Sequence, residues 1–358
     1  MLSAEVKETF LSIIRLGIGH STYFSIQSVD WKAVEALALE HGLSAILIDG
    51  IDRLPESQRP PKMLLLQWIG EVLKNYDQRY ELYRRTIAEI AGWHNAHDFK
   101  MMVLKGYACS LNWPKPEHRP CGDIDIWQFG KQKEVDALMV KEKSIIIDSA
   151  HHHHTVYSWG DFMVENHYDF LNVHHHKSNV ELEAILKDLG KDDTHFIELY
   201  GEKVYLPSSN LHALFLLRHS MSNFASTGFQ LRQLLDWGFF VEKHLNEIDW
   251  KWLEEVLEKY GMKKLYDIFN AICVGDLGFD VHIFPMVQFD PSLKDRVLND
   301  ILSPEFSEIE RGGFVSRAIF KYRRWRANTW KHELCFKESV WSAFWSGVWG
   351  HLMKPASI

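Results

Sequence analysis

The sequence lacks the cysteine pairs that mark disulfide-rich proteins and zinc knuckles. It contains 4 Cys in 358 residues, and no two of them form a C-x-x-C pair. Scattered single cysteines are typical of reduced thiols, whose simplest role is to fill the core. We therefore expect a cytoplasmic protein in which Cys109, Cys121, Cys273 and Cys335 are free thiols.

Long hydrophobic runs are missing as well. Residues 1–10 have neither the basic head nor the apolar run of a signal peptide. The most apolar stretch near the C-terminus, residues 340–353, is interrupted by Ser, Gly and His. A membrane span needs about 20 predominantly apolar residues, so this stretch predicts a packed helix and no membrane span.

Positive charge is not in excess. The 40 Lys and Arg are outnumbered by 48 Asp and Glu, which gives a net charge of -8. This balance argues against a protein that coats nucleic acid through bulk positive charge. The composition, with 46% hydrophobic residues and 14 Trp, is instead that of a globular protein, and the chain is long enough for two or three packed units.

The spacing of apolar residues changes along the chain. The first hundred residues carry them every three or four positions, for example from Leu65 to Ile90, which indicates amphipathic helices. Short apolar or alternating segments follow, and we predict strands at residues 101–104, 123–129 and 162–168.

Helical spacing resumes after Pro207 and continues toward the C-terminus. These changes predict an α+β protein with a small mixed sheet in its middle third. We expect an N-terminal helical region at residues 1–97, an α/β core at 98–206 and a C-terminal helical domain at 207–358.

Two aspartates, Asp123 and Asp125, are one residue apart in a predicted strand. Successive side chains of a strand point to opposite faces, so both carboxylates share one face while Ile124 and Ile126 pack on the other. Adjacent carboxylates repel each other unless a cation lies between them. Mg²⁺ fits, because it binds one or two carboxylates and completes its shell with phosphate oxygens and water.

The later strand offers a third carboxylate. The same alternation places Glu165, His167 and Asp169 on one face. We prefer Glu165, because Asp169 lies two residues beyond His167, close to the expected end of the strand. Together the carboxylates could hold two ions about 3.5–4 Å apart, as in-line displacement at phosphorus requires. Among the histidines, His167 is the one we expect in this site.

A tight turn at Lys105 and Gly106 follows the first predicted strand. A residue without a side chain lets backbone N–H groups approach a triphosphate closely, so Gly106 is our candidate for the phosphate end. Lys105 or Arg119 can add positive charge there. A D-x-D or a Lys-Gly alone is common by chance, and the information lies in their order.

Taken together, these motifs resemble a family of uncharacterised nucleotidyltransferases related to polymerase β. The resemblance is carried by V-L-K-G at residues 103–106, W-P-K-P at 113–116, Arg119 and G-D-I-D-I at 122–126. M-V-E-N-H at residues 163–167 resembles the acidic strand of that family, which ends in E-x-H.

The resemblance extends to helical segments on both sides, at residues 31–47, 211–219 and 231–236. Two departures stand out. Trp113 occupies a position where tyrosine is usual, and Trp127 puts a large indole beside the strand of the two aspartates.

The family resemblance implies a polymerase-β-like core of mixed sheet, flanked by helices. It implies an enzyme that moves a nucleotidyl group from a nucleoside triphosphate, with ATP expected, to an acceptor, using two Mg²⁺ ions and releasing pyrophosphate. The acceptor, whether small molecule, protein or RNA, is not implied. The expected catalytic and metal-binding residues are Asp123, Asp125 and Glu165. The residues expected to contact the nucleotide are Lys105, Gly106, Arg119 and His167.

Other features leave alternatives open. Histidine runs at residues 151–154 and 174–176 suit zinc, copper or nickel, although alternation lets each strand run offer only about half its rings to one site. They equally suit contacts to phosphate or base, or exposed loops. A histidine-based metal hydrolase, or a nucleotide- or partner-binding module without turnover, would also fit.

A basic segment near the C-terminus has two interpretations. Residues 317–331 mix arginines and lysines with Trp325 and Trp330, which suits a docking site for a nucleic-acid acceptor. The same pattern suits a helix with a solvated basic face and tryptophans packed inward, and we favour this second interpretation.

Overall fold

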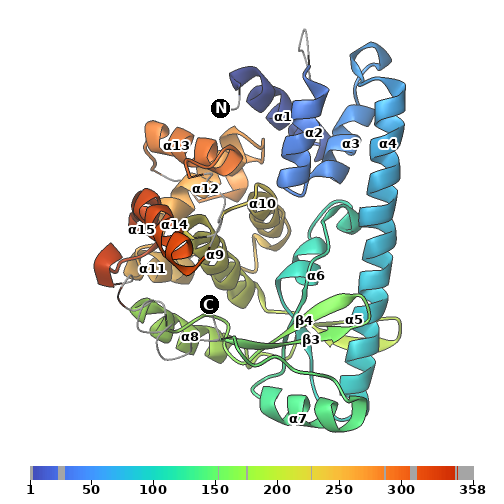
Figure 1. Ribbon diagram of the computed structural model, residues 1–358, viewed down its shortest axis with the longest axis vertical. Helices are drawn as coiled ribbons and strands as arrows, with labels where there is room; N and C mark the ends of the chain where they lie inside the picture. Colours follow the sequence, from blue (N-terminus) through green and yellow to red (C-terminus); the bar gives the residue numbers. More distant parts are fainter. Residues whose placement is uncertain are drawn as a thin grey trace. The chain divides into compact units, whose positions relative to one another are not determined.

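The computed structural model describes residues 3–22, 29–151, 153–174, 176–226, 228–285, 288–306, 313–342 and 345, without the side chains of residues 314, 315 and 318. The chain divides into two compact units, each built from segments distant in sequence (Figure 1). The first comprises the described residues of 1–74, 217–245 and 250–337. The second comprises those of 75–216 and 246–249, with the described residues after 337.

The first unit is helical. Its second helix begins where the sequence places a cap, because the Asp30 carboxylate accepts a hydrogen bond from the backbone N–H of Ala33 over 3.1 Å. The helices are α1 Ala4–Gly17, α2 Trp31–Glu40, α3 Ser44–Asp52, η1 Glu56–Gln58, α4 Lys62–Val72, α10 Arg232–His244, α11 Trp250–Lys259, α12 Lys263–Gly275, η4 Val281–Ile283, α13 Pro291–Leu302, α14 Phe314–Ala327 and α15 Thr329–Cys335. A π-helical stretch, η2 Leu73–Gln78, and α9 Ser209–Ala225 cross the division between the units.

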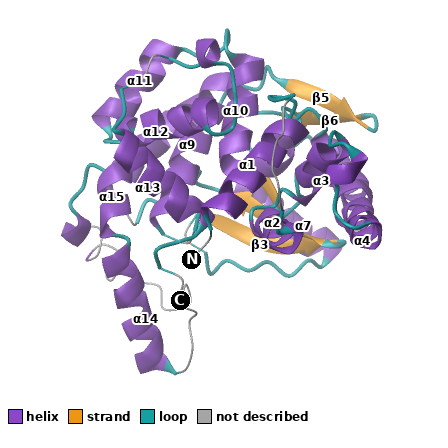
Figure 2. Ribbon diagram, turned by 90° about the horizontal axis from the view of Figure 1, so that it is seen from above, coloured by secondary structure: helices purple, strands orange, loops and turns teal. Residues whose placement is uncertain are grey.

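The second unit contains a six-stranded sheet in the order β3-β4-β2-β1-β6-β5. Its strands are β1 Met102–Val103, β2 Ile124–Trp127, β3 His154–Trp159, β4 Phe162–His167, β5 Phe196–Leu199 and β6 Glu202–Tyr205. The pairs β2–β4 and β1–β6 are parallel and the other pairs are antiparallel, so the sheet is mixed. The β5–β6 hairpin is visible at one edge of the sheet in Figure 2.

One face of this sheet is packed into the core. The helices of the second unit are α5 Arg79–Ala96, α6 Lys105–Ser110, η3 Pro116–His118, α7 Gln132–Lys143 and α8 Lys177–Leu189. Ile87 of α5 and Val135 of α7 belong to the same buried cluster as Ile124, Ile126 and Val164 of the strands. Because side chains alternate along a strand, burial of these residues turns Asp125 and Glu165 to the other face.

The α+β class and the small mixed sheet with flanking helices agree with the sequence prediction. The strands predicted at residues 101–104, 123–129 and 162–168 are present as β1, β2 and β4, each somewhat shorter. Strands β3, β5 and β6 were not predicted. The first begins inside a histidine run, and the β5–β6 hairpin lies at the sheet edge, where Phe196 remains 50% exposed and gives little hydrophobic signal.

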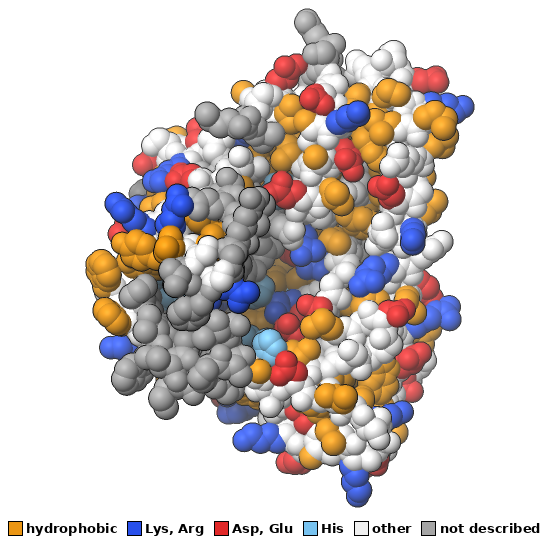
Figure 3. All heavy atoms as spheres, in the orientation of Figure 1, with side chains coloured by type: hydrophobic (Ala, Val, Ile, Leu, Met, Phe, Trp, Pro, Cys, Tyr) orange, Lys and Arg blue, Asp and Glu red, His pale blue; other side chains and the backbone are white. Residues whose placement is uncertain are grey.

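Two further sequence expectations concern the thiols and the C-terminal tail. All four cysteines are free, and three of them, Cys109, Cys273 and Cys335, are buried. The helix expected over residues 340–353 lies largely outside the described residues. None of the helices in the described part of the chain is long and apolar enough to cross a bilayer. On the face drawn in Figure 3, acidic and basic side chains are interspersed.

Candidate active site

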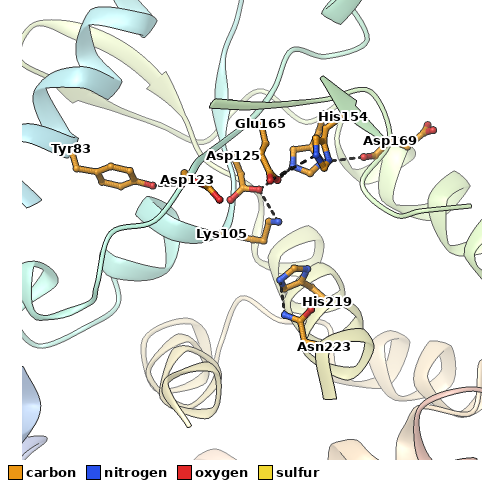
Figure 4. Close-up of polar contacts among 10 residues, drawn as sticks. Tyr83, Lys105, Asp123, Asp125, His154, Glu165, Asp169, His219 and Asn223 are labelled. Atoms are coloured by element: carbon orange, nitrogen blue, oxygen red, sulfur yellow. Dashed lines mark hydrogen bonds and ion pairs between the residues drawn. The ribbon is translucent and has the colours of Figure 1, made fainter. Parts of the chain in front are cut away.

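The candidate site lies on the face of the pair β2–β4 that carries Asp125 and Glu165. The two strands run parallel, with Asp125 opposite Glu165 and Trp127 opposite His167. Side chains opposite each other on neighbouring strands share a face, so Asp125, Glu165 and His167 meet there. Figure 4 shows the side chains of Asp125 and Glu165 close together. Their ligand atoms all lie within 4.8 Å of one another. The predicted juxtaposition of Glu165 with Asp125 is therefore present.

Asp125 is the centre of the cluster. It is only 7% exposed, and its Oδ1 lies 2.7 Å from Nζ of Lys105 and 3.0 Å from Nε2 of His167. Burial alone would raise the pKa of Asp125, but the charge of Lys105 and the hydrogen bond from His167 hold it below its ordinary value. The carboxylate is therefore ionised and compensated by two donors.

The two donors are themselves stabilised in their charged forms. Burial lowers the pKa of Lys105, but the charges of Asp125 and Glu165 outweigh this effect and raise it. Burial likewise opposes protonation of His167, and its hydrogen bonds to Asp125 and Glu165 raise its pKa overall. The other ring nitrogen, Nδ1, lies 3.2 Å from the backbone oxygen of Asp169. A protonated ring with two donors fits this position.

Glu165 lies between histidines. Its carboxylate oxygens are 3.6 Å from Nε2 of His167 and 3.8 Å from Nε2 of His154. The reserve candidate, Asp169, lies beyond the end of β4 and its carboxylate forms an ion pair with Lys187. In Figure 4 the Asp169 side chain points away from Asp125 and Glu165.

Asp123 immediately precedes β2, which begins at Ile124 and not at Asp123 as the alternation suggested. Its side chain is exposed. Partial burial and the neighbouring charges of Glu165 and Asp125 raise its pKa. Repulsion by Glu165 and Asp125 thus adds to desolvation at Asp123. A divalent cation would relieve that repulsion.

Lys105 and Gly106 open helix α6, directly after β1. Lys105 has a φ of +31°, a strained conformation for a residue with a side chain, and its ion pair with Asp125 holds it there. A Cβ at Gly106 would lie 2.6 Å from the hydroxyl oxygen of Tyr83. The structure thus gives Gly106 a packing reason to lack a side chain, in addition to the phosphate approach expected from the sequence.

Arg119 follows the short helix η3, and its Nη1 donates to the backbone oxygen of Pro120 over 3.3 Å. A second arginine, Arg79, lies in the same region. Its guanidinium carbon is 4.7 Å from the ring centre of Phe162, and its Nε donates to the backbone oxygen of Cys121 over 3.4 Å. The charge of Arg79 also opposes the rise in the pKa of Asp123.

Sequence reasoning missed three residues of this region: Tyr83, Arg79 and His154. Tyr83 was counted only as part of the apolar face of a helix, yet its hydroxyl donates to the backbone oxygen of Asp123 over 2.9 Å. Arg79 carried no signal, because a lone arginine on an amphipathic helix usually belongs to its solvated face. His154 lay within a flagged run, but only the strand register shows that it faces His167.

The donor set of this cluster suits Mg²⁺. Asp125 and Glu165 offer carboxylate oxygens, the ligands that magnesium prefers, whereas Asp123 is not in the group whose ligand atoms lie within 4.8 Å of one another. Two of these carboxylates come from adjacent strands, and the third precedes one of those strands. Trp127, the large indole that the sequence analysis noted beside the two aspartates, is buried and packs on Phe170 with ring centres 4.4 Å apart.

Fold and cluster define an α+β protein with a buried Asp125 carboxylate, compensated by Lys105 and His167, on a mixed sheet. The chain belongs to the family of uncharacterised nucleotidyltransferases, whose family model matches residues 27–274, more than half of the 358 residues. Among solved structures, it is similar to an antigenic nucleotidyltransferase-like protein from Paracoccidioides brasiliensis, at 15% identity and a TM-score of 0.36. That similarity covers 55% of this chain and 93% of the other. No curated protein matches the chain.

Proposed function

We propose that the protein is a magnesium-dependent nucleotidyltransferase that transfers a nucleotidyl group from a nucleoside triphosphate, ATP in the first instance, to an acceptor. The observation that carries this proposal is the pairing of Asp125 with Glu165 on parallel strands beside Lys105, in a chain of this family. The free thiols suit a reducing compartment, and we place the activity in the cytoplasm.

In this proposal Asp123, Asp125 and Glu165 hold magnesium, which would neutralise phosphate charge and bring the triphosphate into line. For an ion to reach Oδ1 of Asp125, the Lys105 ammonium must leave it, since the two atoms are 2.7 Å apart. The released ammonium, at the start of α6, is then available to bind a phosphate oxygen. Lys105 therefore neutralises the charge of the Asp125 carboxylate before the ion binds, and a phosphate charge of the substrate afterwards.

The remaining residues hold the substrate and move a proton. Arg119 and the backbone at Gly106 contact phosphates, and His167 keeps Asp125 in place through its hydrogen bond. An oxygen of the acceptor forms a bond to the α-phosphorus while the bond from that phosphorus to the bridging oxygen breaks, and pyrophosphate leaves. Glu165 accepts the acceptor's proton, which its place beside Asp125 allows.

One observation favours a second candidate, a nucleotide- or partner-binding module without turnover. Oδ1 of Asp125 already has two donors, Lys105 and His167, so its charge is compensated without a metal ion. Such a module would bind triphosphate through Lys105 and Arg119 and release no pyrophosphate.

The test is to incubate the protein with each labelled triphosphate, Mg²⁺ and cell extract, and to measure pyrophosphate and the labelled acceptor. We expect product that requires Mg²⁺ and is lost in Asp125→Asn. The matched control is Asp161→Asn, which removes one exposed carboxylate from the turn between β3 and β4. Equal product from Asp125→Asn and Asp161→Asn would contradict the mechanism, and triphosphate binding without product would favour the binding module.

A further inference from the structure

Three imidazoles stand beside the carboxylate cluster. His153, His154 and His167 offer ligand atoms that all lie within 4.8 Å of one another. His154 is directly opposite His167 in the β3–β4 ladder, with ring centres 5.2 Å apart. The ring of His153 lies 4.3 Å from that of His154 and 5.6 Å from that of His167. Of the three rings, the proposed nucleotidyl transfer uses only that of His167.

The group is shielded from solvent. His154 is 6% exposed and His167 is 1% exposed, while His153 is half-buried. Among the described residues, Nδ1 of His154 has no hydrogen-bond partner although the atom is buried. A buried polar nitrogen without a partner is unfavourable, and native proteins usually satisfy such an atom with a ligand or ordered water. Nδ1 of His154 is therefore available to a ligand, while Nε2 of the same ring lies 3.8 Å from Glu165.

The orientation of His167 suits ligation. Its Nδ1 lies 3.2 Å from the backbone oxygen of Asp169, a position from which a ring N–H donates. Histidines that bind metal typically donate one ring nitrogen to a carbonyl or carboxylate in this way and ligate through the other. Nε2 of His167 lies 3.6 Å from the carboxylate of Glu165 and 3.0 Å from that of Asp125.

We propose that His153, His154 and His167 bind a divalent transition-metal ion such as Zn²⁺, with the Glu165 carboxylate as the fourth ligand. Zn–N distances of about 2.0–2.1 Å place the nitrogens of a tetrahedral site roughly 3.3 Å apart. From separations within 4.8 Å, this contraction needs side-chain adjustments of about an ångström. The carboxylate oxygens of Glu165 already lie 3.8 Å from Nε2 of His154 and 3.6 Å from Nε2 of His167.

The chemistry of the donors separates this site from the magnesium site. Imidazole suits zinc, copper, iron and nickel, whereas magnesium prefers oxygen ligands. His167 is a member of both groups, because Asp125, Glu165 and His167 also lie within 4.8 Å of one another, and Glu165 joins the histidines only as the proposed fourth ligand. Zinc ligation by Nε2 of His167 would replace its hydrogen bond to Asp125. The inference does not rest on the proposed transfer reaction.

The test begins with the full chain after removal of metals with a chelator. Titration with Co²⁺ should give one site per chain with the absorption bands of tetrahedral cobalt, and Zn²⁺ should displace the cobalt. Excess Mg²⁺ should leave the cobalt spectrum unchanged. Loss of the spectrum on adding Mg²⁺, or a purely octahedral spectrum, would overturn the proposal.

Variants locate the site. His153→Ala and His154→Ala should each weaken Co²⁺ binding at least about tenfold, the scale of effects on metal affinity at such sites. His195→Ala is the control, because His195 is a half-exposed histidine on the approach to β5. Unchanged binding in His153→Ala and His154→Ala, with circular dichroism showing native folding, would overturn the proposal. Asp125→Asn should keep the tetrahedral spectrum while losing magnesium-dependent transfer, so failures of the two proposals are distinguishable.

Discussion

The hydroxyl group of Tyr83 donates a hydrogen bond to the backbone carbonyl oxygen of Asp123 over 2.9 Å. This bond ties helix α5 to the residue that leads into β2. Tyr83 is 1% exposed, so no water replaces the bond if it is lost. The position of Asp123, and with it one carboxylate of the candidate site, therefore depends on a side chain of a distant helix.

We expect Tyr83→Phe to lower the free energy of unfolding by about 1–2 kcal/mol, because a partly buried hydrogen bond is lost. It should also lower any magnesium-dependent turnover, because Asp123 becomes less fixed. The matched control is Tyr80→Phe, which removes the buried hydrogen bond between Tyr80 and Ser110, 3.0 Å long. Denaturant unfolding should show similar losses in both variants, with turnover reduced only in Tyr83→Phe.

Gly106→Ala should destabilise the protein by about 1–3 kcal/mol, the usual cost of forcing a methyl group into a packed region. The new Cβ would lie 2.6 Å from the Tyr83 hydroxyl oxygen. Gly122→Ala is the control, because a Cβ at Gly122 meets nothing within 4 Å among the described residues. The double variant Gly106→Ala with Tyr83→Phe should lose less stability than the two single variants lose together, as expected for groups in contact. Full additivity in urea unfolding would contradict the packing explanation.

Asp125→Asn and Asp123→Asn should have opposite effects on stability. Asp125 forms an ion pair with Lys105 in which both side chains are at most 15% exposed, so its loss should cost about 3 kcal/mol by leaving a charge unpaired. If only the repulsion between Asp123 and Asp125 mattered, Asp125→Asn would not lower the stability. Asp123→Asn should leave stability unchanged or slightly higher, because its exposed carboxylate is repelled by Glu165 and Asp125. Thermal unfolding at neutral pH checks both.

Glu165→Gln should reduce the rate of nucleotidyl transfer by about 10²-fold or more, the range typical of a positioned general base. Triphosphate affinity should change much less, because the substitution keeps the shape of the side chain. Single-turnover kinetics combined with calorimetry separate the two quantities. A weaker affinity with an unchanged chemical step would assign Glu165 to nucleotide binding instead.

Stability should fall as the pH is lowered from about 6.5 to about 4, in part because of His94. Burial lowers the pKa of His94 from 6.5 to about 4 in the folded protein. In that interval the unfolded chain binds a proton that the folded chain does not, so protonation favours unfolding, by about 3 kcal/mol in total.

The variant His94→Gln should flatten this pH dependence, which denaturant unfolding at several pH values measures. The ring bonds to the backbone oxygen of Ile90 and to Gln128, over 2.8 and 2.7 Å, so it is held neutral. His41 has its pKa lowered in the same way, so the variant removes only the share of His94. An identical slope in the wild type and the variant would contradict the assignment.

The strand face on which the site residues lie could be predicted from the sequence because it depends on local alternation. A period of two places Asp125 on one face of its strand, and Glu165 and His167 on one face of theirs, whatever the rest of the fold does. The pairing of these strands, with Asp125 opposite Glu165, is long-range, and only the family resemblance suggested it.

The partners of these residues could not be predicted. The ion pair of Lys105 with Asp125 requires α6 to begin beside β2, which follows from β1 lying next to β2 in the sheet. Tyr83 holds the backbone of Asp123 through its hydroxyl group, whereas the helical spacing of the sequence reports only that its ring is apolar. Such contacts join segments far apart in sequence, and no periodicity encodes them.

Strand β1 has only two residues, yet it joins the two halves of the sheet. Met102 pairs with Trp127 of β2 on one side and with Tyr205 of β6 on the other. A parallel pairing between such distant segments forms slowly, because a long loop must close first. During synthesis, β1 therefore lacks its pairing with β6 until residue 205 has emerged from the ribosome. Premature termination before β6 would yield a fragment that contains every residue of the candidate site but lacks the strand that completes their support.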